Sequence, residues 1–150
     1  MKLSNLLDRL LSPSGIVHAH CDGPCGVYDP ASARVAAEAV QSLTKKIVDL
    51  GDPTDTAKKN TLVRFVAIKE EQAELAKHEL TILWSDFFKP EHLEAVPSLH
   101  DTFWKALKLC SKCKQEVNPE ACQQLMDAIE NIHNIFWKVK GRDVKWVRAS

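Results

Sequence analysis

The chain has 150 residues, 45% of them hydrophobic and 27% charged, which is typical of one globular domain with a sizeable core. Twenty Lys and Arg balance twenty Asp and Glu, and no stretch reaches the roughly 18 apolar residues of a membrane helix, so neither nucleic acid nor a membrane is an expected partner. The five cysteines are an odd count, which favours a reducing compartment over a closed disulfide framework. We therefore expect a cytoplasmic protein.

The chain begins with an amphipathic segment over residues 3–11, whose leucines recur at helical spacing around Asp8 and Arg9. These two charges argue against a secretory signal. The segment that follows, residues 12–29, contains two His, two Cys, three Gly and two Pro. No helical period explains this composition, so we look for the functional site there.

Four amphipathic helices are predicted next, from apolar residues that recur at steps of three and four. They cover residues 31–50, 58–86, 99–113 and 119–140. Asp29 and Pro30 are expected to start the first helix, Ser98 to cap the third and Asn118 to cap the fourth. Residues 87–97 are predicted to form an ordered aromatic loop, and residues 144–147 are a short strand candidate.

Short connections between four such helices predict an all-α, up-down-up-down four-helix bundle over residues 31–140. Lys69 interrupts the apolar stripe of the second helix. Cys110 and Cys113 match a redox CxxC, but both fall on the apolar stripe of the third helix, which favours buried thiols. Cys122 would face Cys113 across the hairpin of the last two helices, where a disulfide is geometrically possible but disfavoured in a reducing compartment.

Cys21 and Cys25 lie four residues apart across Asp22-Gly23-Pro24, a turn sequence that can bring the second sulfur back toward the first. The spacing alone is a weak metal signal, because zinc sites usually add a second pair of ligands. A turn with two buried thiols is the alternative interpretation. His20, directly before Cys21, favours a metal site.

Residues 20–30, His-Cys-Asp-Gly-Pro-Cys-Gly-Val-Tyr-Asp-Pro, resemble the nickel hook of the nickel-containing superoxide dismutases. The similarity continues at residues 68–70, 73–78, 83–86, 88–90 and 135–137, and covers nearly all of residues 20–140. The resemblance implies a four-helix bundle assembled into a homohexamer. It also implies a nickel enzyme that converts two superoxide anions and two protons into dioxygen and hydrogen peroxide.

The proposed hook, residues 20–28, needs a free chain terminus. If the bond before His20 is cut, its α-amine, the amide nitrogen of Cys21 and the Cys21 sulfur can chelate one metal in two fused rings, and Cys25 closes a square plane suited to nickel. The resemblance implies that the His20 imidazole is an axial ligand of the oxidised metal. Residues 1–19 are therefore expected to be a propeptide removed by a processing protease, rather than merely a disordered extension.

By the same resemblance, Tyr28 lies near the open face of the nickel and limits access, and Lys89 lies near the substrate channel, where its charge attracts an anion. Gly23 departs from the bulkier apolar residue usual at its position, and three further positions depart from the family pattern. Ala36 and Gln72 stand where a glutamate and an arginine are usual, and Phe87 stands where a tyrosine is usual. These differences predict altered surroundings for the His20 imidazole and one hydroxyl fewer at the approach to the metal.

Two other functions remain open from the residues alone. One is a nickel or zinc binding or delivery module without turnover, which would hold metal through the thiols but show no oxidised, axially ligated state. The other is a helical interaction protein whose thiol-bearing arm is inert and binds no metal.

Overall fold

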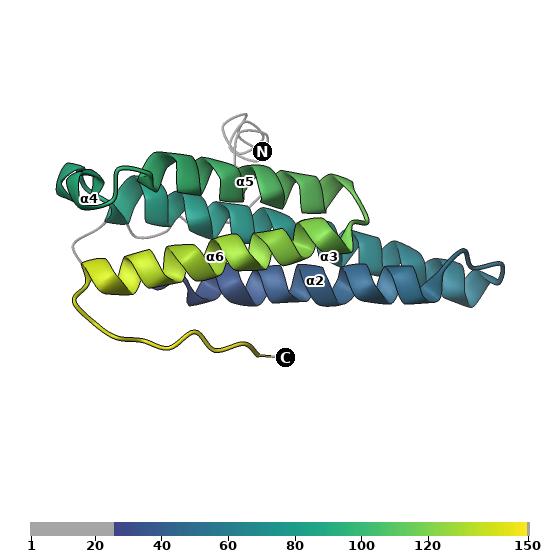
Figure 1. Cartoon of the computed structure of the whole chain (residues 1–150). Coiled ribbons are helices and arrows are strands. Elements are labelled where there is room, and N and C mark those ends of the chain that lie inside the picture. Colours follow the sequence, from purple (N-terminus) through teal and green to yellow (C-terminus); the bar gives the residue numbers. More distant parts are fainter. Residues whose placement is uncertain (1–25, 150) are drawn as a thin grey trace, which may run out of the picture.

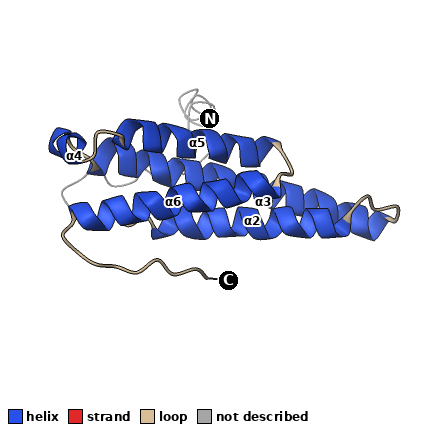
Figure 2. Ribbon diagram, viewed as in Figure 1, coloured by secondary structure: helices blue, strands red, loops and turns tan. Residues whose placement is uncertain are grey.

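The computed structural model of the chain describes residues 26–149. Four long helices form the bundle: α2 (Ala31–Leu50), α3 (Thr56–Ile82), α5 (Leu99–Gln115) and α6 (Pro119–Val139). Each packs against two others, in the order α2–α3–α5–α6 and back to α2, with the direction alternating along the chain (Figure 1). The predicted all-α, up-down-up-down bundle is confirmed, and no strand occurs among residues 26–149 (Figure 2).

Small residues explain why α2 and α3 form the most extensive contact of the bundle. Their facing surfaces carry buried alanines, which let two helix backbones approach closely: Ala33, Ala36, Ala37, Ala73 and Ala76. Larger buried side chains from α5 and α6, including Phe103, Leu125 and Phe136, fill the rest of the core. Hydrophobic burial across these four faces is the main contribution to the stability of the fold.

The segment after α3 differs from the prediction. The helix continues into a π-helical turn, η1 (Leu83–Phe87), and the expected aromatic loop contains a short helix, α4 (Pro90–Ala95). Pro90 takes the first position of α4, where its missing N–H costs no hydrogen bond. The prolines at both ends of this segment therefore bound a helix instead of excluding one.

Figure 1 shows that one end of the bundle gathers the start of α2, the end of α3, α4, the start of α5 and the end of α6. The other end holds only the α2–α3 and α5–α6 connections. After α6 the chain turns back and runs along the bundle without regular secondary structure, so the strand candidate at residues 144–147 is wrong. The extended tail is instead held by side-chain contacts to α2 and α6.

Candidate functional site

The predicted metal ligands His20, Cys21 and Cys25, like the predicted propeptide, lie outside the described residues. The described chain begins at Gly26, the residue directly after Cys25. Gly26 has a φ of 63°, in the left-handed region that residues with a Cβ rarely adopt. This backbone conformation, near the end of the proposed hook, therefore favours glycine at position 26.

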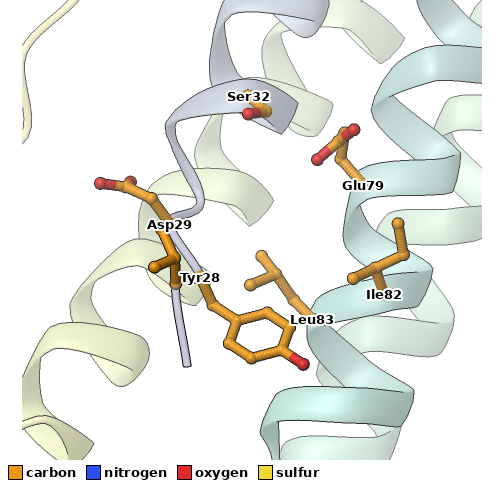
Figure 3. Close-up of a pocket in the computed structure, with 7 residues that line it drawn as sticks. Tyr28, Asp29, Ser32, Glu79, Ile82 and Leu83 are labelled. Carbon is orange, nitrogen blue, oxygen red and sulfur yellow. The ribbon is translucent and has the colours of Figure 1, made fainter. Parts of the chain in front are cut away.

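Tyr28 anchors this entry segment against the bundle. Its half-buried ring extends from the chain before α2 toward Leu83, whereas Asp29 turns to the opposite side (Figure 3). The ring centroid lies 5.7 Å from that of Phe87. Asp29 Oδ1 accepts a hydrogen bond of 2.8 Å from the Ala31 N–H, but the residue that precedes the first helical residue is Pro30. Pro30 itself has helical dihedral angles, with φ of −68° and ψ of −4°, so the Asp29 side chain stabilises the helix start from the predicted position.

A cavity of about 230 Å³ lies beside Tyr28, between the start of α2 and the end of α3. Ser32 and Glu79 face each other across it, and Ile82 and Leu83 form its apolar side (Figure 3). The Tyr28 ring closes the end nearer to η1. Tyr28 also lines a second cavity.

The second cavity, of about 330 Å³, brings together Tyr28, predicted near the metal, and Lys89, predicted near the substrate channel. Three separate parts of the chain line it: the entry segment, the region from η1 to α4, and the end of α6. The lining residues are Gly26, Tyr28, Asp86, Phe87, Lys89, His92, Val139 and Lys140. The structure therefore places Tyr28 and Lys89 in one cavity, next to the residue that follows Cys25.

Local backbone interactions position Lys89 and His92. The Lys89 N–H donates a 3.0 Å hydrogen bond to Nδ1 of His92, and the His92 N–H donates a 2.9 Å bond to the Lys89 carbonyl. These reciprocal bonds close the first turn of α4. The Lys89 side chain is exposed, so its ammonium remains available to an anion entering from solvent.

Phe87, at the end of η1, joins the cavity to the core. Its ring centroid lies 4.5 Å from that of Phe136 and 4.9 Å from that of Phe88. The extra residue per turn in a π-helical segment changes the direction of the side chains that follow it, and such segments are frequent at functional sites. The helical period of α3 continues through this part of the sequence, so the sequence predicts an ordinary helix here and not a π-helical turn.

The three cysteines of the bundle are free, buried thiols, as the sequence predicts: Cys110, Cys113 and Cys122. Burial raises the pKa of Cys110 to about 12. A hydrogen bond to Cys122 together with burial raises the pKa of Cys113. Cys122 Sγ also lies 3.3 Å from Thr44 Oγ1 on α2. These thiols are core groups, remote from the two cavities around Tyr28.

Besides Phe87, two other departures from the family pattern lie among the described residues. Ala36 is almost completely buried between the helices, and Gln72 is half-buried on α3. Among residues 26–149, no cluster of His, Cys, Asp and Glu is arranged to hold a metal ion. Ala36 and Gln72 are predicted to alter the surroundings of the His20 imidazole, and His20 lies outside the described residues.

The described residues form a small all-α bundle, and the residue directly after the cysteine- and histidine-bearing part of the sequence lines a cavity at one end of it. Comparison with known proteins gives the family. The model of the family "nickel-containing superoxide dismutase" matches residues 15–140. The superoxide dismutase [Ni] of Streptomyces coelicolor is 44% identical over 135 residues, covering 90% of this chain and 98% of the relative, and that of Streptomyces seoulensis is equally similar.

Solved structures agree. The native structure of a nickel superoxide dismutase has 43% sequence identity and a TM-score of 0.73, covering 81% of this chain and 99% of the solved one. A structure whose nickel ligation corresponds to the oxidised state has 44% identity and the same TM-score and coverage. The chain belongs to the nickel-containing superoxide dismutases. It is a nickel-dependent oxidoreductase that acts on superoxide, which favours the enzyme over the two alternatives left open by the sequence.

None of the helices among residues 26–149 has the length and apolar character required to cross a bilayer.

Proposed function

We propose that residues 20–28 form the nickel hook of this enzyme, with His20, Cys21 and Cys25 as the ligands. One observation carries the proposal: Gly26 and Tyr28 line the cavity that also holds Lys89, so the chain directly after Cys25 lies at a space open to a small anion. The three cysteines of the bundle are buried in the core, which supports a ligand set drawn from the N-terminal segment. Two thiolates with nitrogen donors suit nickel.

When bound, nickel supplies the change of oxidation state by which one superoxide is oxidised and the next is reduced. The residues of this chain control access to it. Tyr28, fixed against Phe87 and Leu83, limits the space beside the metal and orients small ligands. Lys89 supplies a positive charge at the same cavity, while the chain as a whole has no net charge to attract superoxide.

Maturation follows from the ligand set. The nitrogen of His20 becomes an amine only after the bond to Ala19 is cut, so residues 1–19 act as a propeptide that a processing protease removes. We place the enzyme in the cytoplasm, where its thiols remain reduced. A segment at a chain terminus is expected to gain few contacts within its own subunit, which supports a homohexamer in which neighbouring subunits cover the hook.

The hook is tested with the full-length chain and a chain that begins at His20. The shorter chain should bind nickel and consume superoxide, and the full-length chain should be essentially inactive with nickel. In the shorter chain, Cys21→Ser or Cys25→Ser should abolish activity and the sulfur-to-nickel charge-transfer absorption, because a serine hydroxyl stays protonated near neutrality. Cys110→Ser, a buried core thiol, is the matched control and should retain both. Near-normal activity of Cys25→Ser would exclude the hook.

Two further measurements test assembly and steering. Analytical ultracentrifugation of the processed protein should show a hexamer, and a fully active monomer would contradict the assembly. Lys89→Glu should lower the second-order rate constant with superoxide and weaken its decrease with added salt, with nickel content unchanged. Lys45→Glu, an exposed change of the same charge on α2 outside the cavity, should leave that rate constant nearly unchanged.

A further inference from the structure

We propose that Lys140 is a second cationic guiding residue for superoxide, held in place by the rings of Phe87 and Phe136. The inference extends the proposed function, because it assumes that the cavity beside Gly26 and Tyr28 is the approach to the metal. Lys140 comes from the end of α6, whereas Lys89 precedes α4. Both nevertheless line the same cavity.

The position of the Lys140 ammonium is defined by two aromatic faces. Its Nζ lies 5.6 Å from the ring centroid of Phe87 and 5.4 Å from that of Phe136. Such cation–π contacts retain the positive charge, whereas an ion pair would neutralise it. Lys140 forms no ion pair within residues 26–149, and the C-terminal end of α6, which it follows directly, favours a cation electrostatically.

The charges around the cavity favour an anion. Two ammonium groups, from Lys89 and Lys140, stand against one carboxylate, from Asp86. The Asp86 carboxylate already accepts a 2.6 Å hydrogen bond from the Ser85 hydroxyl, and Nδ1 of His92 accepts from the Lys89 N–H. The cavity therefore has a local positive excess on a chain with no net charge, which raises the local concentration of a small anion.

Phe87 helps to hold the Lys140 ammonium in a defined position. The ring contacts both Tyr28 and Phe136, so it joins the entry segment to α6. A flexible lysine loses several rotamers when it is held in one place, and the two ring faces offset that loss. Phe87 thus acts as a positioning residue for the charge of Lys140.

The first test measures superoxide consumption by the processed, nickel-loaded enzyme across a range of ionic strength. Lys140→Gln should lower the second-order rate constant about two- to fivefold at low salt and flatten its salt dependence, because guidance by charge is screened. Lys138→Gln is the matched control: it is an exposed lysine on the same helix, makes the same charge change and does not line the cavity. Equal salt dependence in the two variants would overturn the proposal.

The second test needs no nickel. Azide, a small monoanion, is titrated at low salt into the metal-free chain that begins at His20, and the amide resonances of Gly26, Phe87 and Lys140 are followed by NMR. These resonances should shift in the unmodified chain and in Lys138→Gln, and the shifts should weaken in Lys140→Gln. Phe87→Leu, which keeps both lysines, should weaken them too. Undiminished shifts in Lys140→Gln would overturn the proposal.

The two proposals fail separately. If Cys25→Ser retains nickel redox activity, the hook is wrong, whatever the azide titration shows. If Cys25→Ser abolishes that activity but Lys140→Gln behaves as Lys138→Gln in both tests, the hook stands and the guiding role of Lys140 does not.

Discussion

Lys69 shows how a charge can be stable inside the bundle. Its side chain is 2% exposed, and its Nζ donates to the carbonyls of Cys113, Lys114 and Glu116 at 2.6, 2.9 and 3.0 Å. The last carbonyls of a helix lack partners within it and carry the negative end of its dipole. The lysine that interrupts the apolar stripe of α3 therefore caps the end of α5.

Replacing this lysine should destabilise the fold. Lys69→Met keeps the length of the side chain but leaves three carbonyls without their donor, so we expect a loss of about 2–4 kcal/mol of unfolding free energy. Lys114→Met removes an exposed ion pair with Glu74 and should cost at most about 1 kcal/mol. Urea denaturation of both variants measures the difference, and equal losses would contradict a capping role for Lys69.

Cys110 makes stability depend on alkaline pH. Burial raises its pKa to about 12 in the folded chain from an ordinary value of about 9, so between these values the folded state binds more protons than the unfolded state. Its stabilising contribution is complete below pH 9 and is lost as pH rises toward 12, at about 1.4 kcal/mol per pH unit. Urea midpoints under reducing conditions should fall less steeply from pH 9 to 10.5 in Cys110→Ala than in the unmodified chain. Parallel curves would contradict this assignment.

At the scale of elements, two predicted helix caps differ: the Asn118 side chain forms a capping hydrogen bond and the Ser98 side chain does not. The Asn118 side chain accepts a 2.9 Å hydrogen bond from the Ala121 N–H at the start of α6. Ser98 precedes α5 without a capping bond from its side chain. The residue type is suited to capping at both positions, so only the backbone geometry distinguishes them.

Asn118→Ala should accordingly lower the unfolding free energy by about 1 kcal/mol, whereas Ser98→Ala should change it by only a few tenths. Thermal or urea unfolding of the two variants tests this directly. A cost for Ser98→Ala as large as that for Asn118→Ala would contradict the difference in capping.

The helices could be predicted because each has an apolar stripe of helical period, interrupted in α3 by Lys69, and clear ends such as Gly51 and Asn118. The π-helical turn and α4 could not, because both depend on how Phe87 and Phe88 pack against α5 and α6. The same limit applies to the site. The motif around Cys21 and Cys25 predicts the metal ligands because they lie within a few residues of one another in the sequence. Lys140 matches no motif, and it reaches the cavity only because the antiparallel arrangement brings the end of α6 there.

At the scale of the whole molecule, the tail after α6 fastens two helices together. His133 Nε2 lies 2.8 Å from the Val144 carbonyl, and the Ala149 N–H donates a 2.8 Å hydrogen bond to the Glu38 carboxylate. Glu38 is buried, and Arg34 lies 3.2 Å from it. The tail thus satisfies a buried carboxylate on α2 and packs Trp146 against His133 on α6.

Removing residues 142–150 should weaken the fold without affecting the metal site. Arg34 would still face Glu38, so we expect a loss of about 1–3 kcal/mol in unfolding free energy rather than complete unfolding. The family match ends at residue 140, which supports a bundle that folds without the tail. Urea denaturation and nickel content of the truncated chain measure both effects. A truncated chain that loses nickel at unchanged stability would contradict this division.

The two cavities around Tyr28 and the α2–α3 and α5–α6 connections lie at opposite ends of the bundle, and this separation determines where the sequence can accept insertions. Every residue that lines the two cavities around Tyr28 lies in the entry segment, in α2 close to its start, or near the adjoining ends of the other helices. The α2–α3 and α5–α6 connections lie at the opposite end (Figure 1). Surface connections tolerate added residues at a small entropic cost. The far end is therefore where insertions, fused domains or new binding loops can be accepted while superoxide chemistry continues unchanged at the other.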